Sequence, residues 1–359
     1  MYKFKDIIEE VEERNTDLRY GLDDIVGVTI EKGLIPTVAN LPQTSLEKFY
    51  IVKPETFVYN SRTHGVRLGM GFNNTTNIYI TSWNNVAFRI KKEAQNIVIP
   101  YYLWLFFCRP IWDRLTNFLA WGSSTIVFAW KDFLNIDIVL PSIEYQREIV
   151  SEYETLSNRI RLNNQMIQNL EATAQALYRK TFVDNIDKEN FPEGWRMGTL
   201  EDVAEIKYGK AHEGIADGDI PIYGSGGIMR YGNKALFDMP SVLIPRKGSL
   251  NNIMYVDKPF WTVDTMFYTQ MKIKNVSKYL YIYLCHFDFQ SMDAGSAVSS
   301  MTSQILNQMD ILIPDEVTLG LFEKQESVIF RNINIRKQGN SKLFKLQSLL
   351  LAKMGYLKQ

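Results

Sequence analysis

The chain contains an internal duplication, and this repeat constrains its fold more than any other sequence feature. The stretch GSSTIVFAWKDFLNIDIVLP (residues 122–141) aligns without a gap on GSAVSSMTSQILNQMDILIP (295–314), sharing the leading Gly-Ser, the Asp-Ile pair and the final Pro. Upstream, PYYLWLFFC (100–108) matches SKYLYIYLC (277–285), so Cys108 and Cys285 occupy one repeat position. Blocks that recur in the same order are the signature of a repeated structural unit, so the sequence predicts two similar modules.

Each copy is followed by a long stretch in which one set of positions recurs at alternating steps of four and three. This heptad spacing keeps one seam on one face of a helix. The predicted seam after the first copy is Ile149, Tyr153, Leu156, Ile160, Asn163, Ile167, Leu170, Ala174 and Leu177. The predicted seam after the second copy includes Ile329, Ile333, Leu343, Leu350 and Met354, with the polar Arg336 and Asn340 in its middle.

Polar residues within an apolar seam usually fix its register, so Asn163 and the Arg336–Asn340 stretch predict that the two helices pair with each other. The alternative is two amphipathic helices that pack only on their own modules. A helix of roughly 38 residues is about 57 Å long, which exceeds one DNA turn of about 34 Å. Such a helix suits a spacer.

Short β-rich runs, such as FYIVKPETFVY and PSVLIPRKG, alternate with Gly, Asn and Pro turns, and the YLWLFF and YLYIYL runs predict buried helices. Each module is therefore expected to be mixed α and β. The segment NFPEGW carries the Pro and Gly of a linker. We predict a first module at 1–141, a helix at 142–185, a second module at 186–314 and a helix at 315–359.

Lys plus Arg and Asp plus Glu are equal at 40 each, so any DNA-binding surface has to be a local patch. Cys108 and Cys285 lie in aromatic-rich runs without a CxxC pattern, which predicts buried free thiols in a reducing compartment. The acidic start MYKFKDIIEEVEERN lacks an apolar signal core, and no apolar run approaches the ~20 residues of a membrane span. We expect a cytoplasmic protein with no membrane partner.

The chain resembles the specificity subunit of Type I restriction-modification systems. In the first module the resemblance rests on GVTIEKGLIPTVANL (27–41), SRTHGVRLG (61–69), FFCRPIWDRL (106–115) and residues 121–150. In the second it rests on GTLEDVAEIKYGK (198–210), IPIYGSGGIMRYG, VLIPRKGSLNNIMYV and WTVDTMFY. The match extends over essentially the whole chain, and its order of module, helix, module, helix is that of the family.

The resemblance implies an α+β fold of two tandem target-recognition domains, each followed by a long helix. The helices would pair as an antiparallel coiled coil with pseudo-two-fold symmetry. Each domain would read one half of a split site on double-stranded DNA, and the helices would set the gap. Two methyltransferase subunits and motor-nuclease restriction subunits would be the protein partners. S-adenosylmethionine, ATP and Mg²⁺ would bind those partners, and this chain would need no cofactor.

Base edges are read by Arg, Lys, Asn, Gln, Ser and Thr side chains, many of them on loops, and phosphates by basic side chains and backbone N–H groups. In the first module the candidates are Arg62, Thr63, His64, Arg67, Asn73 and Asn74. In the second they are Lys207, Tyr208, Lys210, Ser225, Arg246, Lys247, Ser249, Asn251 and Asn252. For each of them a solvated turn residue without DNA contact is the competing interpretation.

Catalysis by the chain itself is the rival hypothesis. The twelve prolines include no Pro-Pro pair, as an amino-methyltransferase motif requires, and there is no GxxxxGK[ST] phosphate loop. The histidines His64, His212 and His286 are scattered, which gives no metal-binding pattern. Glu205-Ile206-Lys207 resembles part of a nuclease motif but has no identifiable carboxylate partner. We predict a non-catalytic recognition subunit; the alternative is a partial or silent coiled-coil scaffold that no longer reads DNA.

Overall fold

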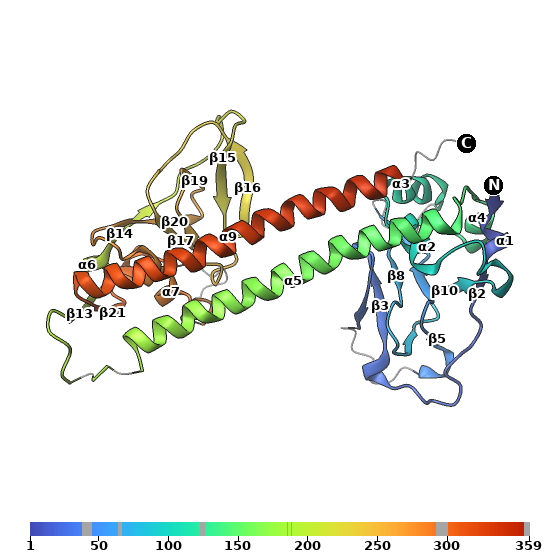
Figure 1. Cartoon of the computed structure of the whole chain (residues 1–359), viewed down its shortest axis with the longest axis horizontal. Helices are drawn as coiled ribbons and strands as arrows, with labels where there is room; N and C mark the ends of the chain where they lie inside the picture. Colours follow the sequence, from blue (N-terminus) through green and yellow to red (C-terminus); the bar gives the residue numbers. More distant parts are fainter. Residues whose placement is uncertain are drawn as a thin grey trace. The chain divides into compact units, whose positions relative to one another are not determined.

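The computed structural model describes residues 1–37, 45–63, 67–122, 126–184, 186–187, 189–291 and 301–354. The chain divides into two compact units: Met1–Arg161 with Asn340–Gln359, and Leu162–Gly339. The long helices α5 (Ile143–Phe182) and α9 (Glu316–Lys353) contribute one segment to each unit (Figure 1). Each unit therefore consists of one module together with a segment of both helices. The domain boundaries at residues 141, 185 and 314 stay predictions.

The first unit is built on a six-stranded sheet in the order β2-β10-β6-β8-β3-β4, with the small pairs β1-β12, β5-β9 and β11-β7. Its strands are β1 (Tyr2–Lys3), β2 (Ile8–Glu10), β3 (Val26–Thr29), β4 (Gly33–Pro36), β5 (Tyr50–Val52), β6 (Phe57–Asn60), β7 (Arg62–Thr63), β8 (Met70–Phe72), β9 (Tyr79–Thr81), β10 (Asn85–Ile90), β11 (Ile126–Val127) and β12 (Asp137–Ile138). Its helices are α1 (Phe4–Ile7), α2 (Pro100–Phe107), α3 (Pro110–Leu119) and α4 (Trp130–Leu134), with 3-10 turns at Leu22–Asp24, Leu46–Lys48 and Lys92–Ala94.

Aromatic rings fill the core of the first unit. Phe57 on β6 stacks on Phe88 of β10 at 5.1 Å, and Phe4 of α1 meets Phe133 of α4 edge-on at 4.9 Å. Helix α2 begins at Pro100, whose fixed φ suits a first helical position, and buries Phe107 against the same cluster. The prediction that YLWLFF forms a buried helix is confirmed.

The second unit has a four-stranded sheet in the order β14-β20-β17-β18, a three-stranded sheet β16-β15-β19 and the pair β13-β21. Its strands are β13 (Arg196–Thr199), β14 (Ala204–Tyr208), β15 (Ile220–Gly224), β16 (Gly227–Gly232), β17 (Ser241–Pro245), β18 (Met254–Val256), β19 (Trp261–Thr262), β20 (Met266–Met271) and β21 (Asp310–Ile313). Its short helices are α6 (Leu200–Val203), α7 (Ser277–Leu284) and α8 (Ser303–Asn307). Helix α7 is the predicted YLYIYL helix, and Tyr279 and Leu280 on it are buried.

Matching backbone hydrogen bonds show that the two units repeat one frame. Phe4 N–H donates to the Ile136 carbonyl at 3.0 Å, and Leu200 N–H donates to the Met309 carbonyl at 2.9 Å. In both units the residue before the first helix donates its backbone N–H to an aspartate three residues later, Lys3 to Asp6 at 2.9 Å and Thr199 to Asp202 at 3.0 Å. The two units differ in their additional strands. In the first unit β3 and β4 extend the six-stranded sheet, whereas in the second unit β16, β15 and β19 form a separate three-stranded sheet.

The helices α5 and α9 run antiparallel where they meet within each unit (Figure 1). In the first unit the Gln347 amide donates to Ser157 Oγ at 2.7 Å, and in the second Lys337 Nζ lies 3.5 Å from Glu171 Oε1. The predicted helix pairing is confirmed, although each helix also packs on the module cores, as Tyr178 on α5 does in the second unit.

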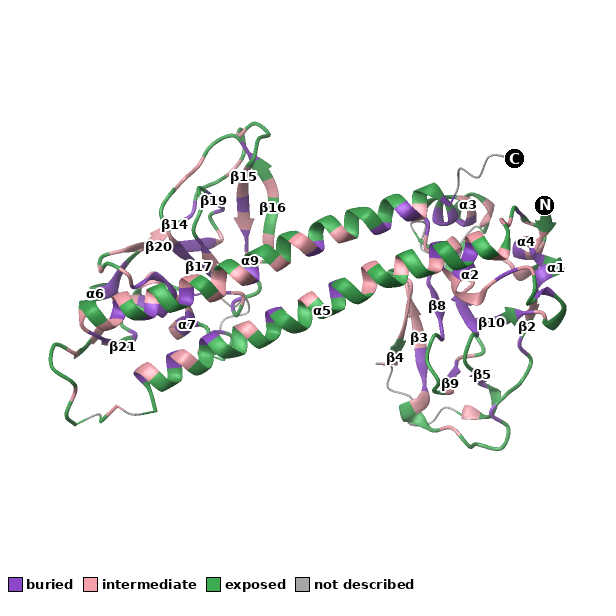
Figure 2. Ribbon diagram, viewed as in Figure 1, coloured by how far each residue is buried: buried purple, intermediate pink, exposed green. Residues whose placement is uncertain are grey.

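Along α5 and α9, buried and half-buried residues alternate with exposed ones (Figure 2), and none of the predicted seam positions is exposed. Those that are buried are Ile149, Ile160, Ile167, Ala174, Ile333, Leu350 and Met354. Those that are half-buried are Tyr153, Leu156, Asn163, Leu170, Leu177, Ile329 and Leu343.

The cysteine prediction needs correction. Cys108 is half-buried, and burial raises the pKa of its thiol to about 12. Cys285 is exposed, because it follows the last residue of α7, where the helix ends at the surface. The shared repeat position therefore does not impose a shared environment.

Candidate nucleic-acid interface

Arg246 and Tyr208 come together at one end of the four-stranded sheet in the second unit. Strand β20 pairs with both β14 and β17, which places Tyr208 and Ile244 on either side of Phe267. The Arg246 guanidinium lies 5.3 Å from the centre of the Tyr208 ring and donates to the Asp264 carbonyl at 3.2 Å. Tyr208 is half exposed, and its hydroxyl lies 3.0 Å from Ser303 Oγ. An arginine held on an exposed aromatic ring is well placed to contact DNA.

Lys210 lies next to this pair because a tightly packed glycine fixes the intervening backbone. A Cβ atom on Gly209 would lie 2.0 Å from the Val263 carbonyl oxygen, so only glycine fits. Lys210 N–H donates to the Thr262 carbonyl at 2.9 Å, and the Lys210 side chain is exposed. Lys207, one residue before Tyr208, forms an ion pair with Glu205 at 2.5 Å. Its charge is therefore partly neutralised.

The loop from Arg246 to Asn252 is locked against the turn that contains Ser225. Asn252 Nδ2 donates to the Ser225 carbonyl at 2.7 Å. Gly248 has φ +83°, and a Cβ atom there would lie 2.7 Å from Ser225 Oγ, so the turn requires glycine twice over. Lys247 and Ser249 are exposed on this loop, whereas Leu250 is buried and anchors it.

Asn251 has its amide group engaged within the protein. Its Nδ2 donates to Asp288 Oδ1 at 2.7 Å, and its Oδ1 accepts from Gln290 N–H at 3.2 Å. The Asn251 hydrogen bond contributes most to holding the pKa of Asp288 below its usual value. Among the candidates in the second unit, three exposed side chains make no contact, among the residues that the structure describes, that holds the loops together. They are Lys210, Lys247 and Ser249.

In the first unit the antiparallel sheet separates residues that are close in sequence. Arg62 follows β6 and is exposed, and Arg67, also exposed, lies just before β8. Asn73 and Asn74 follow β8, which runs antiparallel to β6, so they lie at the opposite end of these strands. The predicted loop surface therefore does not form as one patch. His64 and the side chain of Thr63 lie outside the described residues.

Asn73 does not face solvent, contrary to the expectation for a reading residue. It is 1% exposed, and its Nδ2 donates to the carbonyls of Val52 and Asn77 at 3.1 and 2.8 Å. Its Oδ1 accepts from the backbone and hydroxyl of Thr75. A short amide that satisfies several backbone groups shapes a turn, and Asn74 beside it is the exposed residue.

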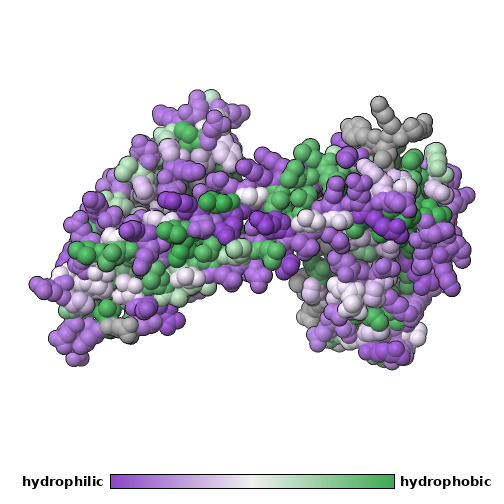
Figure 3. Space-filling view, viewed as in Figure 1, coloured by the Kyte–Doolittle hydropathy of each residue, from purple (hydrophilic) through white to green (hydrophobic). Residues whose placement is uncertain are grey.

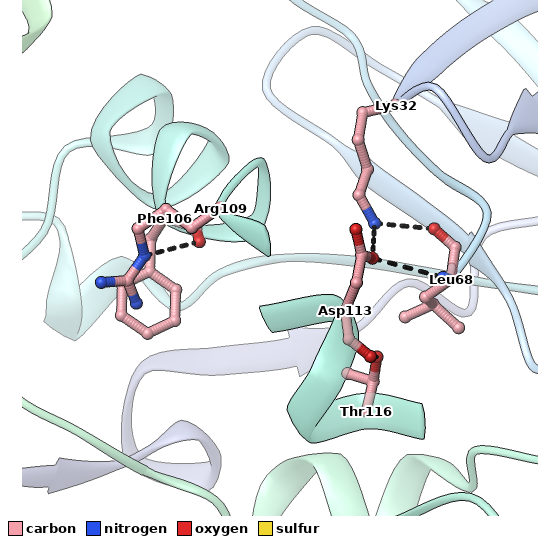
Figure 4. Close-up of polar contacts among 6 residues, drawn as sticks. All are labelled: Lys32, Leu68, Phe106, Arg109, Asp113 and Thr116. Carbon is pink, nitrogen blue, oxygen red and sulfur yellow. Dashed lines mark hydrogen bonds and ion pairs between the residues drawn. The ribbon is translucent and has the colours of Figure 1, made fainter. Parts of the chain in front are cut away.

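Sequence reasoning missed an ion pair that fixes the segment carrying Arg67 (Figure 4). Lys32 Nζ, on the β3–β4 turn, lies 2.5 Å from Asp113 Oδ1 of α3 and donates to the Leu68 carbonyl at 2.7 Å. Asp113 Oδ1 also accepts from Leu68 N–H at 3.3 Å. Burial lowers the pKa of Lys32, and the bond from Asp113 opposes this effect. No local motif signals the pair, since tertiary folding alone brings these residues together.

The described part of the chain offers neither a metal site nor a membrane span. Its His, Cys, Asp and Glu residues form no group of three or more that is placed to hold a metal ion. Its helices include none that is long and apolar enough to cross a membrane.

Comparison with known proteins gives the same organisation. A family model for the Type I restriction modification DNA specificity domain matches twice, at residues 29–172 and 192–326. The S subunit of a Type-I restriction-modification system from M. genitalium has a TM-score of 0.62 at 13% identity, covering 97% of this chain and 94% of that one. At this identity the likeness shows a shared fold.

Two other solved structures are less similar. One, from work on complex assembly and conformational transition of the type I R-M system, has a TM-score of 0.48 at 16% identity, over 98% of this chain and 96% of that one. The HsdS subunit from Thermoanaerobacter tengcongensis has a TM-score of 0.37 at 16% identity, over 98% and 95%. No curated protein matches the sequence significantly.

Proposed function

Because the chain belongs to the Type I restriction modification DNA specificity family, we propose that it reads a bipartite target on double-stranded DNA, one half-site per module. One observation carries this proposal. Phe128 and Met301 occupy the same position of the repeat. Phe128 N–H donates to the Ser61 carbonyl at 2.8 Å, and Met301 N–H donates to the Arg246 carbonyl at 3.0 Å. Ser61 and Arg246 are therefore equivalent, and so are the residues that follow them, Arg62 and Lys247. Each module presents an exposed cation at the same place.

The loops around this shared position differ between the modules, which supports an asymmetric target. The second module adds Tyr208, Arg246 and Lys210, whereas the first adds Arg67. Basic side chains at phosphates would position each module, and arginine or polar side chains at base edges would specify the sequence. Because the chain has no net charge, these local cations are the part of its surface suited to DNA.

The helices α5 and α9 would set the gap between the half-sites. A helix of 40 residues, such as α5, is about 60 Å long. The two helices contact each other in both units, through Gln347 and Ser157 and through Lys337 and Glu171, and this pairing would stiffen the spacer. A fixed spacer predicts a fixed number of unread base pairs.

The protein partners would be two methyltransferase subunits, joined by restriction subunits, and the chain itself would be non-catalytic. In the second unit α9 exposes Val317, Leu321, Val328 and Ile335, with 72, 61, 58 and 58% of each residue accessible. Steps of four, seven and seven place them on one helix face, and apolar side chains are visible along the long helices in Figure 3. An exposed apolar stripe of this kind fits a protein partner.

S-adenosylmethionine, ATP and Mg²⁺ would then bind those partners. A scaffold that assembles with methyltransferase subunits without reading DNA is the second candidate. The exposed cations at equivalent places in both modules favour reading.

Genome-wide mapping of adenine methylation, in cells that express this chain with its methyltransferase partner, tests the proposal. We expect a two-part motif with a fixed gap. Exchanging residues 186–314 for another module should change one half of the motif and leave the other intact. A continuous palindrome would contradict the two-module mechanism, and methylation without sequence preference would favour the scaffold.

A further inference from the structure

Trp121 of the first unit is 68% exposed, although it is held in a fixed backbone position. Its N–H donates to the Val127 carbonyl at 3.1 Å, and its carbonyl accepts from Val127 N–H at 3.0 Å. Val127 on β11 pairs in turn with Arg62 on β7. Trp121, Val127 and Arg62 therefore form one row across three antiparallel segments.

The row faces outward. Residues directly opposite each other in antiparallel pairs share a face, and successive residues along a strand alternate between faces. Phe128, next to Val127, is 0% exposed and packs in the aromatic core. Val127, and with it Trp121 and Arg62, must therefore point away from the core. The exposed Trp121 and Arg62 side chains agree with this direction.

The spacing in the row suits a nucleic-acid backbone. Neighbouring strands lie about 4.8 Å apart, so Trp121 and Arg62 are separated by two strand spacings, roughly 10 Å. An aromatic ring stacks on bases or packs on sugars without regard to sequence, and an arginine beside it neutralises a phosphate. Arg114 on α3 and Arg67 before β8 are further exposed cations in the same unit.

We propose that the Trp121–Val127–Arg62 row is a DNA-contacting surface of the first module. The Trp121 ring packs on a deoxyribose at the edge of the half-site, and Arg62 contacts a phosphate along the same strand. This assignment rests on the proposed function and adds to it an aromatic residue. The row places the Trp121 ring beside Arg62, and Arg62 is equivalent to Lys247 of the second module. Because both modules present a cation at this position, the occupant is double-stranded DNA.

Four variants of the full chain, each purified with its methyltransferase partner, test the row. They are Trp121→Ala, Trp121→Phe, Arg62→Ala and, as a matched control, Ile126→Thr, which lies one residue along β11 and points to the opposite face. Binding is measured by fluorescence anisotropy on a duplex with the mapped target and on one whose first-module half-site is scrambled.

Loss of the buried aromatic contact should weaken binding to the target roughly 5- to 100-fold for Trp121→Ala, with most affinity restored in Trp121→Phe. Arg62→Ala should weaken binding and make it less dependent on salt. Ile126→Thr should match the wild type. Because the ring contact does not depend on sequence, scrambling that half-site should weaken binding of Trp121→Ala and of the wild type by similar factors.

Equal target binding by Trp121→Ala and the wild type would overturn the inference while leaving the proposed function intact. A Trp121→Ala chain that loses its methyltransferase partner on gel filtration, yet binds DNA normally, would overturn it in favour of a protein contact. A wild-type complex that binds no duplex would instead refute the proposed function, and this inference with it.

Discussion

The ammonium group of Lys32 lies 2.5 Å from the carboxylate of Asp113, which is 81 residues away in sequence. Only 8% and 12% of these two side chains are exposed. Breaking a buried pair leaves one uncompensated charge, so Lys32→Met should lower the free energy of unfolding by about 3–5 kcal/mol. Urea denaturation, followed by hydrogen exchange at the Leu68 amide, measures the effect within the first unit.

A double variant and an exposed pair provide the controls for that experiment. Lys32→Met with Asp113→Leu removes both charges, and it should recover much of the lost stability. Lys53 and Glu13 form an exposed pair at 2.6 Å, with 48% and 47% of their side chains accessible. Lys53→Met should change the unfolding free energy by about 1 kcal/mol or less. Equal losses in Lys32→Met and Lys53→Met would show that burial does not govern the Lys32 pair.

The sequence was sufficient to predict features that repeat or are periodic. The duplicated block makes the same backbone hydrogen bond in both units, from Phe128 to Ser61 in the first and from Met301 to Arg246 in the second. The heptad positions predicted the pairing of α5 and α9 because heptad spacing keeps one set of side chains on one face of each helix. Asn73 was misjudged, because its amide is buried and bonds the backbone groups of a turn. Trp121 was missed, because its row with Arg62 is created by strand pairing.

Replacing Arg246 should affect the half-site read by the second module. Its guanidinium is held by the Tyr208 ring and the Asp264 carbonyl, so it is presented in one orientation. Arg246→Ala should weaken binding about 10- to 100-fold and relax the preference in that half of the motif. Arg179→Ala, on an exposed arginine of α5 in the same unit, is the control and should leave the methylation motif unchanged. Anisotropy with half-site variants measures both.

Lys247 should contribute affinity without sequence preference. It is exposed beside Gly248, and we expect it to meet a phosphate. Removing one phosphate contact in Lys247→Ala should reduce the slope of log affinity against log salt by about one. The methylated motif should stay the same. An unchanged slope would place Lys247 away from DNA, and Lys180→Ala on α5 gives the baseline.

Stability should depend on pH through Glu326 in the second unit. Glu326 is 0% exposed, and neither carboxylate oxygen has a hydrogen-bond partner. Burial raises its pKa to about 7, with the nearby Lys278 opposing this effect and Glu323 adding to it. Between about pH 4.5 and 7, Glu326 is therefore protonated in the folded chain and ionised in the unfolded chain. The stabilisation is complete below this window and is lost as pH rises through it.

Glu326→Gln keeps the shape of the protonated acid and removes the titration. We expect this variant to be more stable than the wild type at pH 8, by on the order of 2 kcal/mol, and close to it at pH 5. Thermal unfolding at both pH values measures the difference. Glu316→Gln, at the exposed start of α9, is the control and should show no such change. A gain for Glu326→Gln that is equal at both pH values would point to packing instead of proton binding.

The length of the paired helices should determine the gap between half-sites. Gly339 of α9 faces α5, since a Cβ atom on it would lie 3.8 Å from Asn163 Nδ2. Inserting one heptad after Arg161 and one after Gly339 lengthens both helices by about 10 Å and keeps the seam in register. The mapped motif should keep both halves and gain about three unread base pairs, at about 3.4 Å each. An insertion in α5 alone puts Ser157 and Gln347 out of register and should lower stability. An unchanged gap in the double insertion would show that the helices do not set the spacing.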